Sequence, residues 1–140
     1  RILDGLCDGL SWDDSPSVVK LPTVQHLATS FSGYLNWKKT ILDVVSQLHP
    51  TPAVAGMPTE EALMLIRRLE GDRGWYAGPI GWIDQKGEGQ FNVAIRSGLI
   101  QLNCATLFAG SGIVLGSIAD DEWRETNLKF QPLLAALGDR

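Results

Sequence analysis

Three charged side chains near the end of the chain, Glu122, Glu125 and Lys129, have the spacing of neighbours on one face of an α-helix. Ser117 is a suitable N-cap before this stretch, and the acidic residues that follow it complement the helix dipole. Two carboxylates and an ammonium group held side by side could bind a divalent cation and an anionic ligand. They could equally form a solvated face with helical ion pairs, each worth roughly 0.2–0.5 kcal/mol.

A further charged residue, Arg96, lies within an apolar run that is predicted as one strand over residues 90–102. The two-residue period of a strand places Arg96 on the same face as Asn92 and Ala94. Because an unpaired buried charge is costly, this arginine requires an anionic partner. The sequence leaves open whether that partner is a ligand carboxylate or an internal Asp or Glu.

Glycines and polar rings mark other candidate positions. Gly110 and Gly112 lie at the end of a strand predicted over residues 105–114, where backbone N–H groups can approach an anion, although a bulge or tight turn explains the same pattern. Tyr76 lies in a strand predicted over residues 75–83 and can serve a ligand or remain a core residue with a backbone partner. His26 has no metal-ligand spacing and no nucleophile beside it, so a structural role is its default.

The elements that must position these residues do not alternate as in a doubly wound sheet. Residues 2–6 are predicted as the tail of a helix that began upstream, residues 11–17 as a loop, and residues 18–35 as an extended segment with Pro22 and with alternation through Val24, His26 and Ala28. A helix is predicted over residues 38–48, and residues 49–58 cannot be regular because three prolines and a glycine interrupt them.

Two more helices complete the prediction. Thr59 caps the first, which ends at Gly71 and buries a face of Ala62, Leu65, Ile66 and Leu69. The second covers residues 118–137, and Pro132 bends or ends it. Residues 84–89 have the composition of a hairpin loop. This order predicts an α+β fold with antiparallel sheets flanked by helices.

Composition narrows the classes of function. The 140 residues amount to one domain and carry a net charge of −4, which gives no support to nucleic acid or an anionic membrane as a partner. The two cysteines, Cys7 and Cys104, are far apart without metal-type spacing, so a reduced cytoplasmic protein is the simplest interpretation. No apolar run is long enough to span a bilayer. The chain starts at Arg1 without Met, which suggests a piece of a longer protein.

Six stretches together resemble the chorismate-utilising enzymes, a family that includes isochorismate, salicylate, anthranilate and aminodeoxychorismate synthases. They are VQHLATSFSG (residues 24–33), HPTPAVAGMP (49–58), DRGWYAGPIGW (72–82), VAIRS (93–97), FAGSGIV (108–114) and EWRET followed by Lys129. The HPTPAV segment, with Ala53, and Ile95 before the arginine are similar to the isochorismate synthase form. The resemblance implies that residues 1–140 are the C-terminal part of a single α+β chorismate-binding domain, with antiparallel sheets flanked by helices.

The resemblance also implies roles for single residues. Glu125 corresponds to a glutamate that ligates Mg²⁺, and Glu122 to a nearby acid that usually acts through metal-bound water. Arg96 and Tyr76 correspond to groups that bind one carboxylate of chorismate. The remaining pocket positions are the backbone of Gly110 and Gly112 with Lys129 at the other carboxylate, together with His26, Ala53 and Ile95. Hard oxygen ligands suit Mg²⁺, and cationic side chains suit a dicarboxylate.

One departure from the family's pattern limits what this chain can do. The lysine base, the glutamate acid and the second metal-binding glutamate of the family lie upstream of the segment that corresponds to residue 18, and this chain has no match for them. Ser111 also replaces the usual alanine between the glycines. We therefore expect a chain that is inactive alone and that binds its missing N-terminal half or itself. The alternatives are a salicylate synthase or other family member, or a non-catalytic fragment that binds a dicarboxylate or a protein partner.

Overall fold

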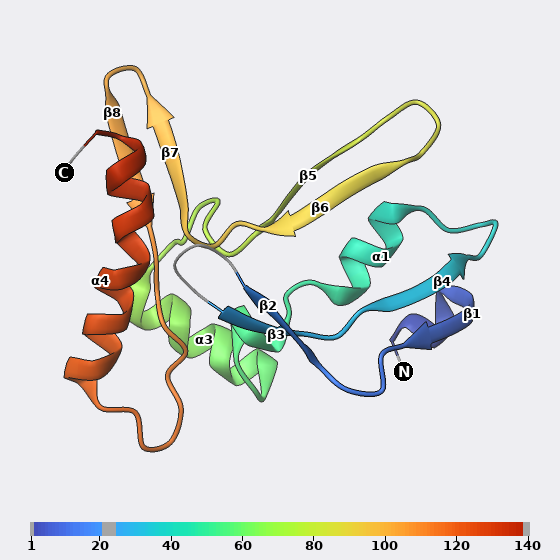
Figure 1. The fold of residues 1–140 in the computed structure, drawn as a ribbon, viewed down its shortest axis with the longest axis horizontal. Coiled ribbons are helices and arrows are strands. Elements are labelled where there is room, and N and C mark those ends of the chain that lie inside the picture. Colours follow the sequence, from blue (N-terminus) through green and yellow to red (C-terminus); the bar gives the residue numbers. More distant parts are fainter. Residues whose placement is uncertain (1, 21–24, 139–140) are drawn as a thin grey trace. The chain divides into compact units, whose positions relative to one another are not determined.

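The computed structural model describes residues 2–20 and 25–138, so the expected extended positions Pro22 and Val24 lie outside the described residues. The chain divides into two compact units, which are described separately. The first contains residues 1–49 and 82–90, and the second contains residues 50–81 and 91–140. The described strands pair two by two, in small sheets with helices between them in the chain, as the predicted α+β class requires (Figure 1).

The first unit contains two antiparallel strand pairs. After the short 3-10 helix η1 (Leu3–Gly5), β1 (Cys7–Trp12) pairs with β4 (Phe31–Leu35), and β2 (Ser17–Lys20) pairs with β3 (Gln25–Ala28). The helix tail predicted over residues 2–6 is therefore a 3-10 turn, the predicted loop over 11–17 overlaps two strands, and the single extended segment is three strands. Two hydrogen bonds of 3.1 Å between Asp13 and Ser30 tie the chain together where one pair gives way to the other.

The helix of the first unit, α1 (Ile41–Leu48), begins three residues later than predicted. Thr40 is its N-cap: the Asp43 N–H donates to the Thr40 hydroxyl at 3.4 Å, and the Thr40 N–H donates to the Asp43 carboxylate at 2.7 Å. This reciprocal capping box satisfies backbone donors that the first turn leaves free, so it sets where the helix starts.

Two helices open the second unit, and both correct the prediction. Residues 49–58 were expected to be irregular, but α2 (Pro52–Ala55) forms one turn with Pro52 at the first helical position, where its missing N–H costs nothing. In α3 (Thr59–Glu70) Thr59 is already helical and Pro58 occupies the N-cap, so Thr59 is not the cap. Gly71 ends this helix as predicted. Its expected buried face is largely open, since Leu69 is 72% exposed.

Strands β5 (Pro79–Ile83) and β6 (Gly89–Val93) form a hairpin. The chain passes from one unit to the other within each of these two strands. The hairpin loop has the predicted composition and is closed by Asp84, whose carboxylate accepts the N–H groups of Lys86 and Glu88 at 2.8 and 2.9 Å. The strand predicted from residue 75 starts only at Pro79, because residues 73–78 form turns.

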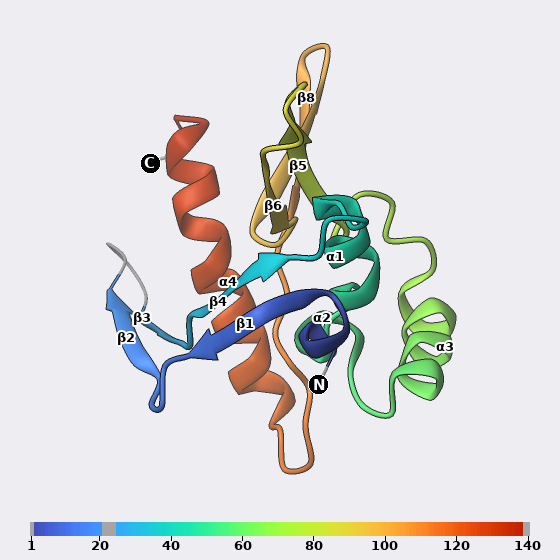
Figure 2. The ribbon, with the colours of Figure 1, turned by 90° about the vertical axis from the view of Figure 1, so that its right-hand side faces the viewer.

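The last elements of the second unit are the β7 (Ser97–Gln101) and β8 (Cys104–Phe108) hairpin and the helix α4 (Ala119–Ala136), which contacts β8 (Figure 1). The strand predicted over residues 105–114 therefore stops at Phe108. Helix α4 differs from its prediction by one residue at each end and continues through Pro132, so this proline does not end it (Figure 2). Among the described residues, no helix combines the length and apolar character needed to cross a membrane.

Candidate functional site

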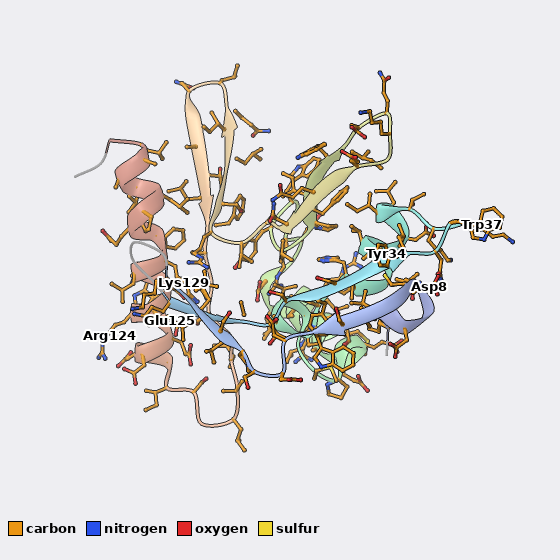
Figure 3. All side chains as sticks on the ribbon, turned by 45° about the vertical axis from the view of Figure 1, so that its right-hand side comes forward. Asp8, Tyr34, Trp37, Arg124, Glu125 and Lys129 are labelled. Atoms are coloured by element: carbon orange, nitrogen blue, oxygen red, sulfur yellow. The ribbon has the colours of Figure 1, made fainter. Side chains whose placement is uncertain are left out.

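The polar face of α4 brings Glu125 and Lys129 into direct contact. Lys129 Nζ lies 2.5 Å from Glu125 Oε1 and also donates a hydrogen bond of 2.9 Å to the backbone oxygen of Gly110. The two side chains are neighbours on the helix, and Arg124 points away from them (Figure 3). The lysine side chain is 24% exposed and the glutamate 53%. An acid, a cation and a glycine that the sequence predicted for one site therefore meet within the second unit.

Glu122 lies one turn earlier on α4 and has a different partner. The Ser117 hydroxyl donates a hydrogen bond of 2.6 Å to Glu122 Oε1. This hydrogen bond, helped by the nearby Ser111 hydroxyl and by the charge of Lys129, lowers the pKa of the Glu122 carboxyl below its ordinary value. The carboxylate is therefore charged at neutral pH, and the residue is half-buried.

The role predicted for Ser117 as the helix N-cap is wrong. Helix α4 begins at Ala119, its N-cap is Ile118, and no side chain caps it. The Ser117 hydroxyl instead bridges the loop and the helix, since it accepts the Val114 N–H at 3.1 Å while it donates to Glu122. Ser117 lies one residue before the N-cap position, and its hydroxyl bonds to Val114 and Glu122 rather than to the N–H groups of the first turn.

Tyr76 lies in the turn before β5 and faces the loop that follows β8. Its ring stacks on Phe108, with centroids 5.8 Å apart and an interplanar angle of 17°. Its hydroxyl lies so close to Gly110 that a Cβ added there would be 2.8 Å from it. Burial raises the pKa of Tyr76, and the nearby charge of Arg73 opposes that rise. The tyrosine is therefore neutral and can donate a hydrogen bond to an anion.

Arg96 does not lie in the middle of a strand, which corrects the prediction. The predicted strand over residues 90–102 is broken, because β6 ends at Val93 and β7 begins at Ser97. The buried Ala94 exchanges hydrogen bonds with Ala77 and Gly78 at 2.9 and 2.8 Å, which holds the chain at the break. Arg96 follows at φ +47°, in the left-handed region, and is half-buried.

Such a backbone conformation is unusual for a residue with a long side chain and is often kept where a function requires it. The alternation argument that placed Arg96 beside Asn92 and Ala94 on one strand face fails, because the two-residue period holds only within a continuous strand. The requirement that a half-buried guanidinium has an anionic partner does not depend on the strand.

The other predicted positions are more scattered. Ile95 lies in the same break and is 43% exposed, Ala53 is exposed on α2, and Gly112 is exposed in the loop after β8 with open space around its Cα. His26 lies on β3 opposite Val19, in the first unit. The second unit therefore contains every predicted site residue except His26.

The chemistry of the donor set is compatible with Mg²⁺. Glu122 and Glu125 offer hard oxygen ligands one turn apart, and Mg²⁺ usually binds proteins through one or two carboxylates while it keeps several waters. Across residues 2–20 and 25–138 no group of three or more His, Cys, Asp and Glu side chains gathers into a metal site. The described residues therefore provide a pair of carboxylates rather than a complete protein cage.

Sequence reasoning missed two residues that organise this region. Arg73 receives no individual role from the sequence, yet it contacts Glu70, the backbone of Val54 and the Tyr76 ring. Ser117, predicted as the N-cap, instead donates a hydrogen bond to Glu122. Arg73 lies three residues after Glu70, a helical spacing for an ion pair that could have been noticed. No local pattern points to the contact between Arg73 and residue 54, because it spans 19 positions.

Comparison with known proteins matches residues 1–138 to a family model described as chorismate binding enzyme. The chain is 48% identical over 133 residues to the isochorismate synthase MenF of Bacillus subtilis, covering 94% of this chain and 28% of that protein. A solved structure named for the 2,3-dihydroxybenzoate-specific isochorismate synthase DhbC of Bacillus anthracis superposes with a TM-score of 0.92 at 40% identity, over 99% of this chain and 38% of the other.

A more distant structure, anthranilate synthase component I of Streptococcus pneumoniae, gives a TM-score of 0.81 at 30% identity, over 91% of this chain and 30% of that one. The chain thus spans between 28% and 38% of the lengths of these three proteins.

Proposed function

This chain belongs to the chorismate binding enzyme family, and from that premise we propose that it is the C-terminal, substrate- and metal-binding part of an isochorismate synthase. Residues 1–140 would then be one portion of a single chorismate-binding domain, and the upstream portion would complete it. The identity to isochorismate synthases exceeds the identity to the anthranilate synthase component, which favours this branch of the family.

One cluster carries the proposal. Within the second unit, Tyr76 OH abuts Gly110, the backbone oxygen of Gly110 accepts from Lys129, and Lys129 pairs with Glu125. A neutral hydroxyl donor, an ammonium group and an exposed carboxylate are thus contiguous. This combination suits a ligand that has negative charge and is bound together with a cation.

The substrate chorismate has two carboxylates, and the chain offers two sets of partners. Arg96 and Tyr76 would bind one carboxylate, the guanidinium through its planar fork and the tyrosine through its hydroxyl. Lys129 would bind the other, together with backbone N–H groups of the loop that contains Gly110 and Gly112. Within the second unit, Ala53 and Ile95 would line the rest of the pocket.

Glu125 would hold Mg²⁺ directly, and Glu122 would support it from one turn away. When bound, Mg²⁺ supplies positive charge that offsets the charge of a substrate carboxylate and of the departing hydroxyl. Lys129 now neutralises Glu125 at 2.5 Å, so binding of the metal and the substrate together would require the lysine to exchange the glutamate for a substrate carboxylate. The chain's own residues would thus bind the substrate and the metal and orient them.

The reaction is an isomerisation, since water adds at C2 of chorismate and the C4 hydroxyl leaves. By the family's pattern a lysine base activates the water and a glutamate acid protonates the departing hydroxyl. Both groups are expected upstream of the segment that corresponds to residue 18. The 140-residue chain would therefore hold substrate and metal without completing the proton transfers.

The test compares two proteins. The first is the complete protein, meaning this chain joined to its upstream portion, or the Bacillus subtilis relative with its matching segment replaced by these 140 residues. The second is the 140-residue chain alone. Chromatography should detect isochorismate from chorismate with the first protein and only when Mg²⁺ is present, and none with the second. Salicylate or anthranilate as the enzymatic product of the complete protein, or turnover by the chain alone, would overturn the proposal.

A further inference from the structure

Arg73 uses its whole guanidinium group to join two segments of the second unit. Its Nε and Nη2 donate to the two carboxylate oxygens of Glu70 at 2.7 and 2.8 Å. Its Nη1 donates at 2.9 Å to the backbone oxygen of Val54, in α2. The side chain is 23% exposed. A bidentate pair fixes the plane of the guanidinium as well as its position, which a single contact would not do.

The fixed guanidinium lies beside the Tyr76 ring. Its central carbon is 5.7 Å from the ring centroid, within the range of a cation–π interaction. The backbone adds a second link, because the Tyr76 N–H donates to the Arg73 backbone oxygen at 3.0 Å. The ring also stacks on Phe108. Tyr76 is therefore held between Arg73 and the end of β8, with its hydroxyl against Gly110.

These contacts form a continuous path from α2 to the polar face of α4. We propose that Arg73 is a positioning residue, which sets the Tyr76 hydroxyl against Gly110 and so shapes the carboxylate site without touching the ligand. This inference rests on the proposed function for its kinetic consequence. It goes beyond that function, because neither the family's pattern of site residues nor the sequence motif assigns a role to Arg73.

The competing explanation is a structural ion pair that only fastens α3 to the following turn. The chain contains a matched pair for comparison. Arg124 Nη1 lies 2.6 Å from Asp121 Oδ1, with the same three-residue spacing as Arg73 and Glu70, on an exposed part of α4. It points away from Glu125 and Lys129 (Figure 3). Loss of Arg124 removes an ion pair of the same spacing, made by a single contact, and nothing from the candidate site.

The kinetic experiment uses the complete protein with the substitutions Arg73→Met, Arg73→Lys and Arg124→Met. Arg73→Met should raise the KM for chorismate by about tenfold or more and change kcat little, because a lost hydrogen bond to a charged group is worth about that factor. Arg73→Lys should recover part of the loss, since it retains the cation beside the ring but not the fork. Arg124→Met should leave both parameters at parental values.

A double variant tests whether Arg73 acts through the tyrosine. If it does, Arg73→Met should add little to the effect of Tyr76→Phe, because the hydroxyl it positions is already gone. Purely additive effects of the two substitutions would contradict the proposal. A parental KM in Arg73→Met would also contradict it. If the methionine variant fails to fold, a parental KM in Arg73→Lys would do the same.

A measurement independent of activity separates this inference from the proposed function. A fluorinated tyrosine at position 76 reports the surroundings of that ring by fluorine NMR. Its resonance should shift or broaden in Arg73→Lys and remain parental in Arg124→Met. An unchanged resonance would overturn the positioning role whatever the enzyme does. The parental protein could fail to turn over chorismate while the Tyr76 resonance still responds to substitution of Arg73. That result would overturn the proposed function alone.

Discussion

Glu125 and Lys129 illustrate how one pair of side chains can serve a site without adding much stability. The pair has the i,i+4 spacing of a helical ion pair, and the glutamate is more than half exposed. Such pairs typically contribute less than about 1 kcal/mol because water screens the charges. The additional hydrogen bond from Lys129 to Gly110 binds the helix to the loop after β8. The pair therefore adds little to fold stability, and its exposed glutamate remains open to a ligand, as the proposed function requires.

The first prediction concerns the metal. Glu125→Gln in the complete protein should abolish productive Mg²⁺ binding, because it removes the charge from a hard-oxygen ligand. It should cost less than about 0.5 kcal/mol of unfolding free energy, as expected for an exposed helical position. Titration calorimetry with Mg²⁺ and chemical denaturation measure the two quantities. Asp121→Asn on the same helix is the control and should change neither. Parental Mg²⁺ affinity in the Glu125 variant would show that this glutamate is not a ligand.

The second prediction concerns the guanidinium of Arg96. Arg96→Lys keeps the positive charge but loses the planar fork, so chorismate binding should weaken by about tenfold or more if the contact is bidentate. The backbone φ of +47° at this position should not change, since lysine and arginine meet the same steric limits there. The KM and the dissociation constant of a non-reacting chorismate analogue measure the effect. A variant that binds the analogue as tightly as the parent would remove Arg96 from the site.

The third prediction concerns the contact between Tyr76 and Gly110. In Gly110→Ala the new Cβ would lie 2.8 Å from the Tyr76 hydroxyl, and the stacked ring has little freedom to withdraw. We expect a loss of about 1–3 kcal/mol in the unfolding free energy of the complete protein, as for other overpacked sites. Adding Tyr76→Phe should restore most of that stability, because it removes the clashing oxygen. Gly112→Ala, with no atom near the new Cβ, should be stable. A failure of Tyr76→Phe to rescue would contradict the contact.

Elements in this chain start and stop where particular side chains satisfy the backbone. The capping box of Thr40 and Asp43 delays α1 relative to the apolar pattern, and Gly71 ends α3. In α4 no side chain caps the first turn, since the N-cap residue is Ile118. The Ser117 hydroxyl, one residue before that N-cap, bonds to Glu122 on the helix.

The fourth prediction tests the α1 cap through its pH dependence. Hydrogen bonds from the backbone and side chain of Thr40 lower the pKa of the Asp43 carboxyl below 3.8. A group whose folded pKa is lowered stabilises the fold above its unfolded pKa and loses that contribution as the pH falls through the folded value. Asp43→Asn should therefore be less stable than the parent at neutral pH, and the difference should shrink as the pH falls through the lowered pKa of the Asp43 carboxyl.

Thermal unfolding of the complete protein over that pH range measures the difference. Ser46→Ala provides the control on the same helix, because the Ser46 hydroxyl bonds to the Asp43 backbone oxygen and does not titrate. A difference between Asp43→Asn and the parent that stays constant with pH would contradict the capping role of the carboxylate.

Across the whole molecule, apolar side chains lie at the surface. In the described residues the apolar side chains that are less than a tenth exposed are Leu6, Ala55, Ala77 and Ala94. Large side chains remain open, among them Trp37 at 87% and Trp75 at 73%. Soluble monomers rarely leave so many large apolar side chains uncovered. Two-stranded sheets also present unpaired edges.

The fifth prediction follows from that surface. The 140-residue chain alone should bind a hydrophobic dye and self-associate, because its exposed apolar side chains and strand edges lack the partners that the upstream portion would provide. Light scattering and dye fluorescence measure these properties, and co-expression with the upstream portion should suppress both. A monomer that melts cooperatively without binding dye would show that the chain needs no completing segment.

Local sequence patterns determined much of this protein. The amphipathic spacing predicted α1, α3 and α4, the composition of residues 84–89 predicted the β5–β6 turn, and the order of elements predicted the α+β class. Six motifs identified the family, which the match over residues 1–138 confirmed. These features depend on interactions within a few positions of the chain or on residues that a family shares, so they are visible in a single sequence.

Only the tertiary structure decided which residues meet. The strand through Arg96 is broken because Ala94 bonds to Ala77 and Gly78, residues 16 or more positions away in the chain, and no local propensity records that pairing. Arg73 reaches Val54, and Lys129 reaches Gly110, each across 19 positions. Burial likewise depends on what packs against a face, so the apolar stripe of α3 predicted a core that these residues do not form by themselves. Contacts between distant segments are properties of the folded chain, and the candidate site is made of them.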